Sequence, residues 1–184
     1  MEGSKLKKSE KLTILSLAKG TYDLCRCYFY YHDYYWYYYI LDYSDKFIFG
    51  IEEYDFQLNG FQIRKISELE KIELKNDLCT KINMDKKILE NINAPIVNLS
   101  SWHDVFISLS GTAKFLIVQN ENNKHNGPYF YVGKIRKVKK SSVILSPFDA
   151  DGKWFDDVEL PFSEITSVTF GDRYSTVFGE YISE

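Results

Sequence analysis

The sequence repeats one pattern of apolar residues at a fixed distance of 96 residues. The run Ile66-Ser67-Glu68-Leu69 returns as Phe162-Ser163-Glu164-Ile165, and the apolar positions after each run also match. Upstream, Phe47-Ile48-Phe49 returns at the same offset as Val143-Ile144-Leu145. Because one offset holds over about 30 residues, the two halves of the chain are predicted to be copies of one supersecondary unit.

The aromatic residues indicate that each copy is built mainly from strands. Tyr, Phe and Trp make up 17% of the sequence, and such rings are enriched in pleated, half-buried sheets. We therefore expect a mainly β fold with short helices, in the α+β class. The chain of 184 residues provides two units of about 90 residues, each near the lower end of the sizes that fold independently.

Each copy is predicted to begin with a short helix and to continue with five strands. The helices are expected between Ser9 and Gly20 and between Ser101 and Gly111, because each range starts with a capping residue and ends with glycine. The expected strands cover residues 22–31, 35–43, 46–54, 61–66 and 70–75 in the first copy, and residues 114–119, 129–138, 142–148, 155–161 and 166–170 in the second.

Turn residues and polar runs mark the breaks between these elements. Asn59-Gly60 and Asp151-Gly152 are predicted hairpin turns, because Asn, Asp and Gly adopt positive φ readily. Residues 119–127 form a polar loop, and apolar residues at helical spacing predict a C-terminal helix over 172–182. The predicted organisation is a first domain over 1–82, a linker over 83–100 and a second domain over 101–184.

A helix followed by five short strands resembles the Sm-like (SH3-like) small β-barrel. More specifically, the runs at 59–66 (NGFQIRKI) and 163–174 (SEITSVTFGDRY) look like a family of uncharacterised bacterial proteins with tandem small barrels. This resemblance implies a closed five-stranded barrel in each half. It does not imply RNA binding, because the matching turns at 75–77 and 171–173 lack the residue patterns with which Sm-like proteins hold RNA.

Charge and cysteine content limit the compartment and the partners. The net charge of −3 provides no general attraction for phosphates. The three cysteines are odd in number, and Cys25 and Cys27 are too close along one strand to form a relaxed disulfide, so we expect reduced thiols in a cytoplasmic protein. The apolar stretch from Leu12 to Ala18 is better explained as a packed helix than as a signal peptide, and no membrane partner is expected.

The first candidate site is an aromatic hairpin. Ten of the twelve residues from Tyr28 to Tyr39 are aromatic, and side chains alternate along a strand, so one core cannot bury them all. One set is expected to point inward: Cys25, Cys27, Phe29, Tyr35, Tyr37 and Tyr39. The other is expected to face outward as a partner-binding surface: Arg26, Tyr28, Tyr30, Trp36 and Tyr38. The alternative is that a helix or the other copy covers this face.

The second candidate site is a basic strand. Its five cations could contact phosphates together with stacked tyrosines, as in an Sm-like RNA-binding protein: Lys134, Arg136, Lys137, Lys139 and Lys140. The alternative is a solvated edge strand, in which lysines prevent pairing with other chains. Acidic residues between 149 and 159 would weaken the positive field.

The sequence contains no catalytic signature. Cys25, Cys27 and His32 make an incomplete thiol or zinc site, and residues 149–152 match only the opening of a calcium loop. We therefore expect no enzyme activity, no metal and no cofactor. The predicted function is binding to another protein, or to a second copy, as an adaptor or an immunity-type inhibitor that occludes its partner through the aromatic hairpin.

Overall fold

The computed structural model describes residues 5–21, 23–122 and 127–182. Tyr22, at the start of the first predicted strand, and residues 123–126 of the predicted polar loop lie outside the described residues. The chain divides into two compact units, residues 1–94 and 95–184. The boundary between them falls inside the segment predicted as a linker.

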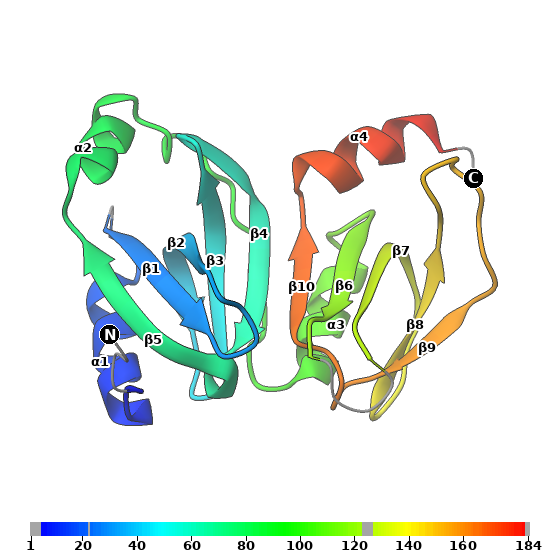
Figure 1. Cartoon of the computed structure of the whole chain (residues 1–184). Coiled ribbons are helices and arrows are strands. Elements are labelled where there is room, and N and C mark those ends of the chain that lie inside the picture. Colours follow the sequence, from blue (N-terminus) through cyan, green and yellow to red (C-terminus); the bar gives the residue numbers. More distant parts are fainter. Residues whose placement is uncertain (1–4, 22, 123–126, 183–184) are drawn as a thin grey trace. The chain divides into compact units, whose positions relative to one another are not determined.

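The first unit is a five-stranded antiparallel sheet with two helices (Figure 1). Its helices are α1 (Lys8–Ala18) and α2 (Leu78–Asp85), and its strands are β1 (Leu24–Phe29), β2 (Tyr35–Tyr43), β3 (Phe47–Tyr54), β4 (Gln57–Lys65) and β5 (Leu69–Lys75). The strands lie in the order β5-β1-β2-β3-β4. One turn of 3₁₀ helix, Ile66–Glu68, separates β4 from β5.

The second unit has its own five strands and two helices. Its helices are α3 (Trp102–Ser110) and α4 (Arg173–Tyr181), and its strands are β6 (Leu116–Asn120), β7 (Tyr129–Val138), β8 (Ser142–Pro147), β9 (Val158–Pro161) and β10 (Ser167–Phe170). The strands lie in the order β10-β6-β7-β8-β9. The predicted C-terminal helix is therefore confirmed, with Asp172 as its N-cap.

Both units share one sequence of elements, a helix and five strands, and in both the last strand pairs with the first. The structure confirms the prediction of a mainly β fold in the α+β class. The prediction of a closed barrel in each half is not confirmed. Among the described residues the end strands β4 and β5, and likewise β9 and β10, are not hydrogen-bonded neighbours, so the sheet of each unit is open.

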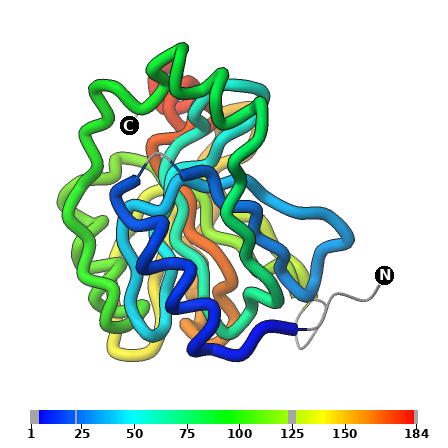
Figure 2. Tube along the Cα trace, turned by 90° about the vertical axis from the view of Figure 1, so that its left-hand side faces the viewer, coloured from blue at the N-terminus to red at the C-terminus, as the bar shows by residue number. Residues whose placement is uncertain are grey.

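The sheet of the first unit is covered on two sides. On one side Leu15 and Ala18 of α1 pack against Cys25, Cys27 and Phe29, and Figure 2 shows this helix lying across the strands. The opposite side has a smaller core that α2 and the turns after it cover: Leu24, Tyr39 and Ile51, with Cys79, Ile88 and Leu89 packed against them. The cover formed by α2 and the turns after it is short, so the part of β1 and β2 nearest their connecting turn extends beyond it.

The turn between β3 and β4 differs from the prediction. Asn59-Gly60 lies inside β4, beside a register shift at Ile51/Glu53 where Gly60 adopts φ +78°. The hairpin turn is Asp55-Phe56, with φ values of 49° and 63°. The sequence signal for a tight turn therefore marks a bulge, which also needs a residue with positive φ. The second predicted turn is confirmed, since Gly152 has φ +75° and its N–H donates to the carbonyl of Asp149 at 3.0 Å.

Candidate functional site

The register of the β1–β2 hairpin decides which of its aromatic side chains face outward. Arg26 lies opposite Tyr37, and Cys27 lies opposite Trp36. Directly opposed residues of an antiparallel pair carry their side chains on the same face of the sheet. Trp36 therefore shares the face of the buried cysteine, and Tyr37 shares the face of the arginine.

The predicted orientation of the second strand is consequently wrong. Trp36 and Tyr38 pack on the α1 side, where Tyr38 is buried, while Tyr35 and Tyr37 lie on the opposite face with Arg26. Each even-numbered residue of β1 lies opposite an odd-numbered residue of β2. The sequence prediction placed even-numbered residues of both strands together, although a turn with an even number of residues, such as the expected His32-Asp33, sets even-numbered residues opposite odd-numbered ones.

A buried polar network holds the inward side of the hairpin. The Tyr38 hydroxyl donates to the side-chain oxygen of Gln62, and the Nε of Arg64 donates to the same oxygen at 2.5 Å. The Arg64 guanidinium is buried and lies 4.5 Å from the ring centre of Phe29 and 5.3 Å from that of Trp36. Burial raises the pKa of Tyr38 well above its usual range. Trp36 and Tyr38 therefore stabilise the hairpin rather than present it to a partner.

Arg26 organises the outward side. Its guanidinium lies 4.4 Å from the ring centre of Tyr35 and donates to the Tyr37 hydroxyl at 3.1 Å. Glu73 of β5 completes the group, with one carboxylate oxygen 3.8 Å from Arg26 and 3.3 Å from the hydroxyl of Tyr28. Cation–π contacts and charged hydrogen bonds thus fix the positions of three tyrosine rings.

Beside this group the structure has a pocket of about 370 Å³, called the ring pocket below. It lies between the outer half of β2, the β3–β4 turn and the start of α2. The lining residues are Tyr34, Tyr35, Trp36, Tyr37, Glu52, Glu53, Tyr54, Asp55, Phe56 and Cys79. Four of its rings are well exposed: Tyr34 (54%), Tyr35 (43%), Tyr54 (67%) and Phe56 (41%).

We use the name hairpin surface for the outward residues of the β1–β2 hairpin together with the exposed rings that line the ring pocket: Arg26, Tyr28, Tyr34, Tyr35, Tyr37, Tyr54 and Phe56. Arg26 and Tyr28 belong to the predicted partner-binding set and lie on it. Tyr30, from the same set, is 39% exposed near the hairpin turn, which stands out in light blue from the first unit in Figure 2. Sequence reasoning missed Tyr54 and Phe56, because the Asn59-Gly60 signal placed the turn elsewhere.

Of the five predicted cations, Lys134, Arg136 and Lys137 lie on β7, and Lys139 and Lys140 follow its end. Several of these cations have partners within the second unit. The Lys134 ammonium lies 5.3 Å from the ring centre of Phe115, and Lys139 forms an ion pair of 2.7 Å with Glu159. Arg136 lies 3.9 Å from a carboxylate oxygen of Asp157. Lys137 and Lys140 are exposed. The acidic residues predicted to weaken the positive field of this strand therefore do lie against it.

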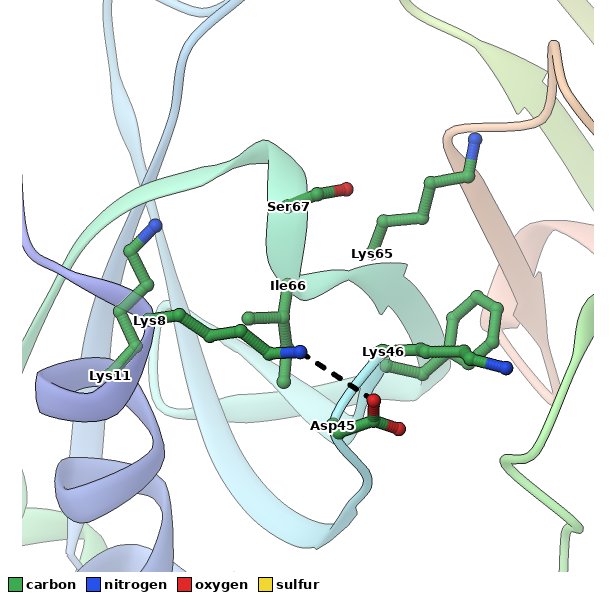
Figure 3. Close-up of a pocket in the computed structure, with 8 residues that line it drawn as sticks. Lys8, Lys11, Asp45, Lys46, Lys65, Ile66 and Ser67 are labelled. Atoms are coloured by element: carbon green, nitrogen blue, oxygen red, sulfur yellow. Dashed lines mark ion pairs between the residues drawn. The ribbon is translucent and has the colours of Figure 1, made fainter.

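A second pocket, of about 380 Å³, is lined by four lysines, but their ammonium groups diverge (Figure 3). Lys8 reaches Asp45 at 3.5 Å, and Lys11 turns away to donate to the carbonyl of Leu69. Lys65 pairs with Glu68 at 3.4 Å. Because the charges do not converge on one point, this pocket lacks the geometry of an anion site.

The cysteines have the properties of buried structural thiols. Burial raises the pKa of Cys25 to about 12 and raises that of Cys27 well above its usual range. A thiol in this state is a poor nucleophile and a poor metal ligand. Within the described ranges no three His, Cys, Asp or Glu side chains are grouped as a metal would require.

The helices of the described part of the chain are too short and too polar to cross a bilayer. Comparison of the chain with family models, with curated protein sequences and with solved structures found no match. A functional proposal for this chain has to be argued from its own surface.

Proposed function

We propose that this protein works by binding another protein through the hairpin surface, without catalysis, as an adaptor or an immunity-type inhibitor that occludes its partner. The observation that carries this proposal is the group of four exposed rings around the ring pocket. Tyrosine, tryptophan and arginine dominate the energetics of protein interfaces, whereas large exposed apolar groups on monomeric proteins are uncommon.

The rigidity of these rings supports the same proposal. Tyr35 makes edge-to-face contacts with Tyr28 at 5.6 Å and with Tyr37 at 5.3 Å, and the Arg26 guanidinium lies against its ring. A side chain that is already ordered loses little conformational entropy when a partner binds. The hairpin surface is therefore suited to tight binding over a modest area.

The shared element order of the two units supports a proposed relationship to tandem Sm-like folds, and the three unpaired cysteines support a cytoplasmic setting. An RNA-binding role would use a different surface, the basic strand of the second unit. Because at least two of its cations pair with acidic residues, we favour protein binding.

Affinity capture from the source cell with matched variants tests the proposal. Tyr35→Ala removes the central ring of the hairpin surface, and Tyr181→Ala removes an exposed ring of α4 as the control. We expect one protein to be captured by the wild type and by Tyr181→Ala, and to bind Tyr35→Ala at least about tenfold more weakly. Equal binding to both variants, or capture of nucleic acid that is lost between low and moderate salt, would refute it.

A further inference from the structure

Glu53 is a buried carboxylate in the wall of the ring pocket. Its side chain is 4% exposed, and among the described residues its one hydrogen bond comes from the N–H of Phe56, 2.7 Å from Oε1. The nearby Arg26 pairs with Glu73 on the next strand, not with Glu53. Among the described residues no hydrogen bond to the second carboxylate oxygen is found, and Glu53 lines the ring pocket.

The pairing of β3 with β2 explains how an acidic residue comes to lie there. Glu53 is opposite Tyr37 on β2, as Ile51 is opposite Tyr39. Glu53 therefore lies on the outward face with the tyrosines. Burying a carboxylate without a cation is costly, so such an arrangement persists where a ligand or function uses it.

The charge of Glu53 acts on neighbouring groups. Burial and then the Glu53 carboxylate raise the pKa of the Cys79 thiol. Burial raises the pKa of Tyr39 to about 12, and the same carboxylate adds to this rise. The floor of the ring pocket thus has a negative field and no cation of its own among the described residues.

The rim is built by a strained turn. Asp55 and Phe56 both have positive φ, and this is a rare conformation for a bulky residue such as Phe56. The hydrogen bond from the Phe56 N–H to Glu53 holds the turn, which leaves the Phe56 ring 41% exposed at the pocket. Strain of this kind is concentrated at ligand-binding sites.

We propose that the ring pocket binds a lysine or arginine side chain of the partner protein, with the cation against Glu53 and its stem between the aromatic rings. This proposal rests on the proposed function and adds to it the chemistry of the partner. Tyrosine and phenylalanine faces attract cations, and a desolvated carboxylate strengthens that attraction. An anion would meet the acidic residues Glu53 and Asp55, and an apolar side chain would leave the Glu53 carboxylate without a counter-charge.

Small-molecule probes of the pocket provide the test. The full chain is titrated with Nα-acetyl-lysine methylamide and Nα-acetyl-arginine methylamide, and with the norleucine analogue as the uncharged control, while backbone amide NMR signals are recorded. We expect saturable shifts at Tyr54, Phe56 and Cys79 with the cationic probes and at least about fivefold weaker binding of norleucine. Equal binding of norleucine, or no shift at these residues, would overturn the proposal.

Variants test whether the Glu53 carboxylate is responsible for the binding of the cationic probes. Glu53→Gln keeps an acceptor for the Phe56 N–H and removes the charge, while Glu180→Gln removes an exposed charge of α4 as the control. Asp55→Asn is a second test that keeps the fold, since Asn tolerates positive φ. We expect both pocket variants, but not Glu180→Gln, to weaken binding of the cationic probes severalfold. Unchanged affinity in both would refute the role of the acidic residues.

The same variants separate this inference from the proposed function. If the partner is lost by Tyr35→Ala but bound normally by Glu53→Gln and Asp55→Asn, the hairpin surface binds protein and the pocket does not need a cation. If cationic probes bind and Tyr35→Ala leaves partner capture unchanged, the pocket takes a cation and the proposed interface is wrong.

Discussion

At the scale of single residues, Glu53 and Glu68, two of the buried acidic side chains, have different surroundings. Glu68 has an ammonium partner, Lys65 at 3.4 Å, and accepts a hydrogen bond from the Tyr31 hydroxyl at 3.0 Å. Glu53 accepts one backbone hydrogen bond, and no ion pair with it is found in the described part of the chain. Burying a charge costs stability, and the cost is larger for a carboxylate without a cation, so the surroundings of Glu53 point to a ligand.

Removing the Glu53 charge is therefore expected to stabilise the free protein. Glu53→Gln keeps the turn hydrogen bond and removes the desolvated carboxylate, so we expect the free energy of unfolding to rise by about 1 kcal/mol in urea titrations. Glu180→Gln, at an exposed position, should leave it unchanged. A clear loss of stability in Glu53→Gln would show that the carboxylate has a structural partner.

The pH dependence of stability provides a separate test at Glu68. Burial, opposed by the charge of Lys65, raises the pKa of Glu68 above its ordinary value of 4.5. The folded state therefore binds this proton more tightly than the unfolded state, and stability from this group is lost as pH rises from about 4.5 towards the raised folded-state pKa. Urea titrations across this range should show wild type losing stability relative to Glu68→Gln. Parallel curves would contradict the expected shift.

At the scale of elements, the β3–β4 turn and the β7–β8 pair show how local geometry limits the side chain. Gly133 of β7 lies where an added Cβ would overlap the carbonyl oxygen of Ser146 on β8. Gly111, after α3, has open space at its Cβ position and a φ of −100°. Packing therefore requires glycine at position 133, whereas neither the space nor the backbone conformation requires it at position 111.

Substituting alanine for Gly133 and for Gly111 should change the free energy of unfolding by different amounts. Because the strands must move apart to accommodate the methyl group, we expect Gly133→Ala to destabilise the protein by about 2 kcal/mol. Gly111→Ala should change the free energy of unfolding by less than about 0.5 kcal/mol. Thermal unfolding followed by circular dichroism measures both variants, and equal effects would contradict the close approach of β7 and β8.

The turn variant Phe56→Gly should be more stable than the wild type and should bind the partner more weakly. Glycine adopts a φ of 63° without steric cost, so we expect an increase of about 1 kcal/mol in the free energy of unfolding together with weaker partner binding. Phe56→Ala keeps the strain and removes the ring, so it should weaken binding without the gain in stability. A glycine variant that binds normally would show that this ring is not part of the interface.

At the scale of the whole molecule, the chain divides into two compact units, and the segment that joins them contains strongly exposed residues. Ile96 is 97% exposed, and residues 92–98 belong to no helix or strand. Limited proteolysis followed by mass spectrometry should therefore cut first between about residues 86 and 98 and release two fragments of similar mass. First cleavage inside the hairpin turn at 30–34 would show instead that the candidate interface is the least ordered segment.

Much of the element order could be predicted from the sequence. The fixed offset, the capping residues and the aromatic strands gave the two leading helices, most strands and the C-terminal helix, because these signals are local. Helix α2 was missed, because the linker was expected to begin at residue 83, inside Leu78–Asp85. The turn at Asp55-Phe56 was missed because a bulky residue such as Phe56 is not a turn former, and the surrounding sheet imposes positive φ on it.

The candidate site depended more on tertiary structure. By itself the sequence determined that aromatic strands recur in two copies and that more rings are present than one core can bury, since composition and alternation are properties of the chain. Only the folded structure decided that Tyr35 and Tyr37 face outward and that Glu53 lies among them. The reason is that strand register depends on turn length and bulges, and a shift of one residue moves every side chain to the other face.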